Sequence, residues 1–193
     1  MKKYMVEQSG RSMIEMLGVL AIVGVLSVAG IAGYSKAMAK YKVNKLTDQV
    51  TMTAANVKTT FAGQGDYSGL TTVVAHNLGV FPEEMDKDCG SASCTPKNAM
   101  GGDVALAETT DDKYSFDFTV SGITKDACST LATADWGSAA GFKGIVASGI
   151  EGCDTGICTP ANLQSKAITI ASKLCTPKTE GDDNSYSITW RFY

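Results

Sequence analysis

The first strong pattern along the chain is a run of twenty uncharged, mostly apolar residues from Met16 to Ser35. As an α-helix, at about 1.5 Å per residue, this run is roughly 30 Å long, which matches the hydrocarbon thickness of a bilayer. Glu15 stands directly before the run, and Arg11 lies four residues earlier. A carboxylate here is costly for a solitary membrane helix, so the pattern predicts a helix whose acidic group meets a partner.

An amphipathic pattern continues the helix beyond the apolar run. Apolar residues recur at steps of three and four, the period of one helical face, at Ala39, Val43, Leu46, Val50, Ala54, Val57 and Phe61. Gly63 and Gly65 follow as natural helix stops. The two patterns together predict one helix of roughly fifty residues, apolar in its first half and amphipathic in its second. A membrane anchor followed by a separate helix is the alternative.

The middle of the chain predicts short elements between loops. Residues 66–110 are rich in loop-forming residues and carry an acidic patch of Glu83, Glu84, Asp86 and Asp88. Clean alternation predicts a half-buried strand over 114–120, and a second strand is expected at 144–148. Between them, residues 124–134 predict a short helix with Thr124 as its cap.

The end of the chain predicts a strand that belongs inside a sheet. Residues 160–175 fit either a helix or a strand. Residues 185–193 alternate, and one face of this strand holds Tyr186, Ile188, Trp190 and Phe192. A few strands together with helices predict an α+β fold with an antiparallel sheet, and we expect the final strand to be central in it.

Composition and charge narrow the class of protein. The chain has 193 residues, 44% of them hydrophobic, and a formal net charge of −3. These values indicate a folded protein, and nothing in them suggests nucleic-acid binding. About 158 residues follow the apolar run, enough for one domain with its own core. Six cysteines after a membrane-length segment favour an oxidising compartment.

The spacing of the cysteines leaves their pairing open. Cys89 and Cys94 are five apart, as are Cys153 and Cys158, whereas Cys128 and Cys175 are isolated. Six cysteines allow fifteen connectivities. The simplest pairing joins Cys89 to Cys94, Cys153 to Cys158 and Cys128 to Cys175. A zinc site built from the two close pairs is the competing interpretation, but an oxidising compartment works against it, so no metal is expected.

Candidate catalytic chemistry is sparse. His76 is the single histidine and lies in an apolar stretch, so we expect it to be structural. Asp111, Asp112 and the run 182–184 fit solvated turns better than a calcium site. With no second histidine for a triad and no phosphate-loop spacing, the sequence predicts a protein that is not an enzyme and has no cofactor.

Three interpretations of the amino terminus compete. A secretory signal peptide would end near 29–32, and a plain signal anchor would stay uncut. The third interpretation explains the glycine, the carboxylate and the apolar run together: Gly10-Arg11, followed by Glu15 and then Met16–Ser35, resembles the processing site of type IV prepilins. Positive charges lie on both sides of the run, so charge alone does not place the amino end in the cytoplasm.

The resemblance extends along most of the chain. Three segments are similar to segments of the type IVb major pilins, especially the pilins of bundle-forming pili. They are Tyr67-Ser-Gly-Leu70, Lys125-Asp-Ala-Cys-Ser-Thr-Leu-Ala132 and Gly141-Phe-Lys-Gly-Ile-Val-Ala-Ser-Gly149. In that family two late cysteines pair across the variable region, which implies the Cys128–Cys175 bridge. Pairing of the other four cysteines rests on their spacing alone.

The resemblance also implies roles for the first residues. Cleavage after Gly10 makes Arg11 the first mature residue and the site of N-methylation, and it makes Glu15 the fifth residue, which sets register between neighbouring subunits. The family usually has Phe or Met where this chain has Arg11, and its type IVb leaders are usually longer than ten residues.

The implied organisation has four parts. Residues 1–10 form a leader, 11–35 the transmembrane and assembly half of a long helix, 36–62 its amphipathic half, and 63–193 a globular head. The helix packs on the head's antiparallel sheet, and disulfides hold the carboxy-terminal region.

The resemblance implies a structural subunit of a surface fibre for adhesion, aggregation or DNA transfer. Its partners are identical subunits, a prepilin peptidase, an inner-membrane platform with its ATPase, and an outer-membrane secretin. The subunit spans the inner membrane once before it joins the extracellular pilus. A type II secretion pseudopilin, or a binding domain released by signal peptidase, is the alternative.

Overall fold

The fold is described from a computed structural model, which describes residues 13–87, 89, 94–137, 141–151, 153, 156–176 and 186–193. The chain divides into two units, Met1–Lys40 and Tyr41–Tyr193. The described part of the first unit is helical throughout, and the second unit holds the sheet and the hydrophobic core.

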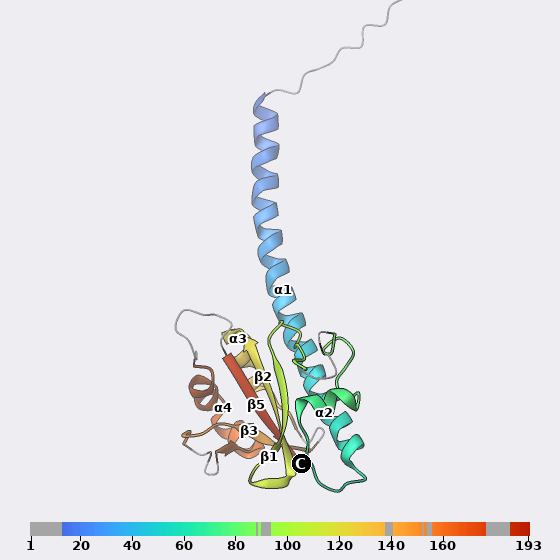
Figure 1. Cartoon of the computed structure of the whole chain (residues 1–193). Coiled ribbons are helices and arrows are strands. Elements are labelled where there is room, and N and C mark those ends of the chain that lie inside the picture. Colours follow the sequence, from blue (N-terminus) through green and yellow to red (C-terminus); the bar gives the residue numbers. More distant parts are fainter. Residues whose placement is uncertain are drawn as a thin grey trace, which may run out of the picture. The chain divides into compact units, whose positions relative to one another are not determined.

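Helix α1, Met13–Phe61, is the longest element and contributes residues to both units (Figure 1). Its 49 residues confirm the prediction of one long helix rather than two. The helix ends where the glycines begin: the carbonyl of Phe61 accepts hydrogen bonds from the amides of Gln64 and Gly65. Gly65 has a φ of 79°, a left-handed conformation that favours glycine and stops the helix.

The second unit contains a five-stranded sheet in the order β1-β2-β5-β3-β4, with every neighbouring pair antiparallel. Its strands are β1 Val104–Thr109, β2 Asp112–Ile123, β3 Phe142–Val146, β4 Ile157–Cys158 and β5 Tyr186–Phe192. The predicted antiparallel α+β class is therefore confirmed. The final strand β5, red in Figure 1, lies in the middle of the sheet, as its position and alternation predict.

The described residues of the second unit also form three shorter α-helices. They are α2 Thr72–Asn77, α3 Lys125–Thr133 and α4 Pro160–Leu174. The Thr124 hydroxyl accepts a hydrogen bond from the Ala127 amide, which confirms the predicted cap of α3. The ambiguous stretch 160–175 is helical, with a kink at Lys166, where φ is −130°. Helix α2 and strand β1 lie in the stretch for which the sequence predicts only loops.

The core joins one face of α1 to one face of the sheet. In β5 every second side chain is buried, namely Tyr186, Ile188, Trp190 and Phe192, as predicted. On α1 the predicted stripe is buried from Leu46 onward, whereas Ala39 is exposed. Two polar residues also lie on the buried face, Gln49 and Thr53. Gln49 is satisfied because its amide donates to Glu84 at 2.8 Å and accepts from the Ala99 backbone at 3.0 Å.

Candidate functional site

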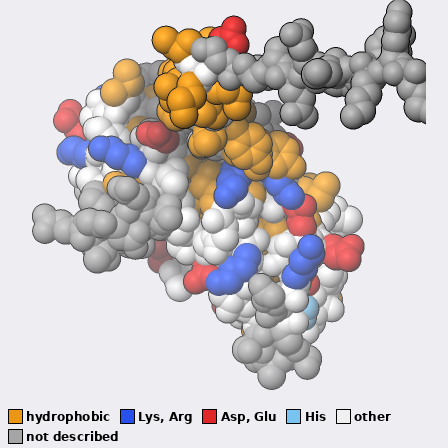
Figure 2. Space-filling view, turned by 90° about the horizontal axis from the view of Figure 1, so that it is seen from above, with side chains coloured by type: hydrophobic (Ala, Val, Ile, Leu, Met, Phe, Trp, Pro, Cys, Tyr) orange, Lys and Arg blue, Asp and Glu red, His pale blue; other side chains and the backbone are white. Residues whose placement is uncertain are grey.

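The described part of the first unit presents an apolar surface that no other described part of the chain buries. Helix α1 is long and apolar enough to cross a membrane, and it alone passes that test of length and composition among the described residues. Its large side chains are exposed: Ile14 is 76% and Leu20 62% accessible. Figure 2 shows such hydrophobic side chains gathered on the helical segment. An apolar surface of this extent requires lipid or other protein to cover it.

Glu15 is the only charged residue of α1 before Lys36. It lies in the first turn of the helix, where a carboxylate interacts favourably with the positive end of the helix dipole. The two serines of the segment satisfy their hydroxyls internally, since Ser27 donates to the Val23 carbonyl at 2.7 Å and Ser35 to that of Ile31 at 3.0 Å. Gly10 and Arg11, the predicted cleavage and methylation positions, lie outside the described residues.

Four glycines leave bare backbone on the same segment. A Cβ placed on Gly18, Gly24, Gly30 or Gly33 would meet no atom within 4 Å beyond the adjacent backbone of its own helix. The packing of this chain therefore does not require glycine at these positions. Small residues on apolar helices allow a second helix to approach closely, so the four glycines suit contacts between helices.

The disulfide with the greatest sequence separation connects two helices of the second unit. Cys128, in α3, bonds to Cys175, which directly follows α4, with a Cα–Cα distance of 5.8 Å. Both residues are buried, and α3 and α4 pack against each other. The bridge spans 47 residues, for which chain entropy gives a stabilisation of about 4 kcal/mol.

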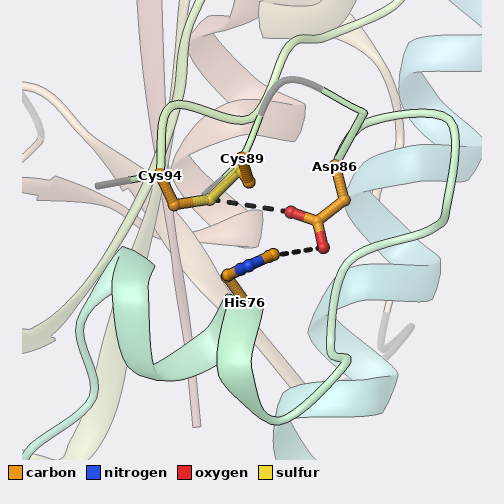
Figure 3. Close-up of side chains that lie close together, drawn as sticks. All are labelled: His76, Asp86, Cys89 and Cys94. Atoms are coloured by element: carbon orange, nitrogen blue, oxygen red, sulfur yellow. Dashed lines mark hydrogen bonds and ion pairs between the residues drawn. A yellow bond between two sulfur atoms is a disulfide. The ribbon is translucent and has the colours of Figure 1, made fainter. Parts of the chain in front are cut away.

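The other two disulfides close short loops. Cys153 bonds to Cys158, and Cys89 to Cys94, each across a sequence separation of 5. Cys158 lies in β4, opposite Ile145 of β3, so its bridge ties the preceding turn to the sheet edge. Cys94 lies beside Asp86, and Asp86 also pairs with His76 (Figure 3).

One acidic group of the head has a strongly shifted pKa. The Asp112 carboxylate accepts hydrogen bonds from Lys143 Nζ at 2.8 Å, Ser115 Oγ at 2.6 Å and the Tyr114 amide at 3.0 Å. These contacts, that of Lys143 foremost, lower the pKa of Asp112 to about 2. Asp112 thus serves a structural ion pair, while residues 182–184, the other acidic turn, lie outside the described residues.

Several side-chain contacts of the second unit were not predicted from the sequence. The pairing of His76 with Asp86 depends on the path of the loop that follows α2, and the pairing of Glu84 with Gln49 and Lys45 depends on how that loop meets α1. Glu84, at 2.7 Å from Lys45, has its pKa lowered by the hydrogen bonds it accepts from that lysine and from Gln49. A polar residue on an otherwise apolar stripe, such as Gln49, is the one local signal of such a contact.

Comparisons with known proteins agree with these features. A family profile described as PilS N terminal matches residues 40–190. The major structural subunit of bundle-forming pilus from Escherichia coli O127:H6 (strain E2348/69 / EPEC) is 25% identical over 190 residues, which cover 98% of this chain and 95% of that protein. The subunit of the same description from Escherichia coli O111:H- is 24% identical with the same coverage.

The crystal structure of TcpA, a type IV pilin from Vibrio cholerae El Tor biotype, aligns with a TM-score of 0.49 and 17% sequence identity. The alignment covers 79% of this chain and 99% of that one.

Proposed function

This chain belongs to the PilS family and is a type IV pilin, and from that premise we propose how its first helix builds the pilus. As a structural subunit it polymerises with identical copies into an extracellular fibre. The observation that carries the proposal is the exposed apolar surface of α1, with Glu15 as its one charge before Lys36. We propose that this surface lies in the inner membrane before assembly and against the same surface of other subunits afterwards.

Moving the apolar half of α1 from the lipid of the membrane into the fibre favours a core of packed helices. Covering one large apolar side chain is worth about 1.5–3 kcal/mol relative to water, so the segment remains in lipid until other helices replace the lipid. Between helices in lipid, close packing supplies the attraction, and the bare glycine positions allow it. An unpaired carboxylate in this medium is costly. Glu15 therefore favours only those arrangements in which a cation of the neighbouring subunit meets it, which fixes the axial register.

Proteolytic processing of the amino terminus would create the positive charge that meets Glu15. We propose that a prepilin peptidase cuts between Gly10 and Arg11 and that the new α-amine of Arg11 is methylated. The amine and the guanidinium of Arg11 then both belong to a residue four positions before Glu15 in the sequence.

The proposed division of the chain has four parts: residues 1–10 are the leader, 11–35 the assembly segment, 36–62 the amphipathic half of the helix, and 63–193 the head. A membrane platform with its ATPase adds subunits, and an outer-membrane secretin passes the fibre.

The head supplies the outer surface of the fibre. Its core, its sheet and its disulfides hold a fixed surface on which adhesion, aggregation or DNA transfer depends. The proposal includes no catalytic role, because both relatives that cover nearly the whole chain are described as structural subunits.

The deciding experiment compares two acidic residues of the same helix. Glu15→Ala should abolish or sharply reduce fibres while the subunit still accumulates in the membrane. Asp48→Ala is the matched control, because Asp48 is an exposed carboxylate of α1 beyond the apolar segment, and it should leave fibre yield unchanged. Normal fibre yield in Glu15→Ala would refute the register role. Amino-terminal sequencing should find Arg11 first, and a mature start near Gly33 would contradict assembly through this helix.

A further inference from the structure

Four side chains that can bind a metal ion converge beside the end of α2 (Figure 3). His76, Asp86, Cys89 and Cys94 each offer one ligand atom, and these atoms all lie within 4.8 Å of one another. The carboxylate of Asp86 is central in the group: one oxygen is 2.6 Å from His76 Nδ1 and the other is 3.6 Å from Cys94 Sγ. All four residues are half-buried, so the group is held by the fold and still reachable from solvent.

The backbone that carries this group is fixed by the core. His76 follows Ala75, which is fully buried, and its carbonyl accepts from the Gly79 amide at 2.9 Å. Asp86 follows Met85, which is 1% exposed. The Met85 amide donates to Pro82 and its carbonyl accepts from Lys97, so the turn before Cys89 is bonded to the segment after Cys94. The ligand atoms therefore converge without rearrangement of the elements that carry them.

We propose that, when Cys89 and Cys94 are thiols, these four residues bind one Zn²⁺ ion. One imidazole nitrogen, one carboxylate oxygen and two thiolates are a set that zinc takes in tetrahedral geometry. Ligand distances of about 2.0–2.3 Å place tetrahedral donor atoms roughly 3.3–3.8 Å apart, so a spread of up to 4.8 Å needs only side-chain adjustment. A coordinating imidazole is neutral and offers a bare nitrogen, so when His76 Nδ1 binds the ion its one N–H is at Nε2, and two metal–ligand bonds replace the hydrogen bond between His76 and Asp86.

Zinc and the Cys89–Cys94 disulfide exclude each other. The disulfide has no thiolate to donate to a metal. A dithiol reductant supplies two electrons and two protons, becomes a disulfide itself, and leaves Cys89 and Cys94 as thiols. Zinc then displaces one proton from each thiol. A newly made chain starts in the thiol form, so the ion can bind before the disulfide forms. A disulfide-bearing oxidant then takes two electrons from the two thiolates and becomes a dithiol, the Cys89–Cys94 bond forms, and the ion is released.

This disulfide is also the one a mild reductant reaches first. Cys89 and Cys94 are half-buried. The other four cysteines are 5% exposed or less: Cys128, Cys153, Cys158 and Cys175. Since thiol–disulfide exchange needs access to sulfur, the zinc form can be prepared while the two buried bridges remain intact.

The test uses the full chain in detergent micelles, reduced with a low concentration of dithiothreitol and then freed of it. Alkylation and mass spectrometry should show two free thiols, at Cys89 and Cys94. Titration with Zn²⁺ should reach one ion per chain, and Co²⁺ should give the visible spectrum of a tetrahedral site with thiolate-to-metal charge transfer. The unreduced chain should bind neither ion in this way. One-to-one binding by the unreduced chain would overturn the proposal.

Variants separate the four-residue site from a pair of thiols. His76→Gln and Asp86→Asn should each weaken zinc binding by at least about 10–100-fold, the loss found even for outer partners of metal ligands. The matched control removes the equally spaced pair, Cys153→Ala with Cys158→Ala, and should leave binding unchanged. Binding of equal strength in His76→Gln and Asp86→Asn would refute the site, as would a reduced wild-type chain that binds no zinc. The wild-type comparison decides even if a variant misfolds.

Discussion

At the scale of single residues, some charged side chains of the head form ion pairs that link separate strands. Arg191 of β5 donates two hydrogen bonds to Asp117 of β2, at 2.6 and 2.7 Å, between residues directly opposite in the sheet. Lys143 of β3 bonds to Asp112, the first residue of β2. Such pairs are spaced far apart in sequence, so their partners follow from the register of the sheet and not from local patterns.

The Asp112–Lys143 pair predicts a specific response to acid. Its folded pKa of about 2 lies below the ordinary value of about 3.9. The pair therefore stabilises the fold fully above about pH 4, and this contribution is lost as pH falls from about 4 toward 2. Lys143→Met should move the pKa of Asp112 upward toward 3.9, measured from its carboxyl NMR shift against pH. Lys97→Met, which removes the exposed Lys97–Asp103 pair, is the control and should leave the pKa of Asp112 unchanged. A pKa of Asp112 unmoved in Lys143→Met would show that its hydrogen bonds to Ser115 and Tyr114 suffice.

A second residue-scale prediction concerns the cap of α3. Thr124→Ala removes the hydroxyl that accepts from the Ala127 amide, so the free energy of unfolding should fall by about 1 kcal/mol. Thr130→Ala is the matched control in the same helix, because Thr130 is exposed and its hydroxyl only returns to the Asp126 carbonyl. Denaturant unfolding of both variants measures the difference. Equal stability of the two variants would mean that the cap contributes nothing.

At the scale of elements, the long helix and the final strand were predictable because each carries its own period. Steps of three and four set the buried face of α1, and alternation set that of β5. Helix α2 was not predictable, since its six residues bury only Ala75 and show no period. Strand β1 has an irregular burial pattern and depends on pairing with β2. The convergence of His76, Asp86, Cys89 and Cys94 depends on those same loops, so the sequence contained its residues but not their meeting.

The loop lengths closed by the disulfides predict how much each bridge contributes to the free energy of unfolding. Replacing Cys128 and Cys175 together by Ala should lower the free energy of unfolding by about 4 kcal/mol, since that bridge closes the longest loop. The same double replacement at Cys153 and Cys158, whose separation is only 5, should cost about 2 kcal/mol. Both cysteine pairs are buried, so the comparison isolates loop length. Equal losses in denaturant unfolding, or a larger loss for the short bridge, would contradict this order.

At the scale of the whole molecule, the second unit holds the described core, and the first unit carries the surface proposed for assembly. Residues of α1 from Leu46 onward are packed in that core. The described residues of the first unit contribute none of the buried residues of that core. The stability of the head and the capacity to assemble are therefore expected to respond to different substitutions on the same helix.

Two substitutions on α1 test that division directly. Leu46→Ala empties a fully buried position and should lower the free energy of unfolding of the head by about 2–5 kcal/mol. A Cβ at Gly24 would meet no atom within 4 Å beyond the adjacent backbone of its own helix, so Gly24→Ile should leave head stability unchanged while it obstructs close approach of another helix and reduces fibres. Thermal unfolding reports the first effect, and fibre yield per subunit present in the membrane reports the second. If Gly24→Ile lowered head stability, or if it left fibre yield untouched, glycine at this position would not serve contacts between subunits.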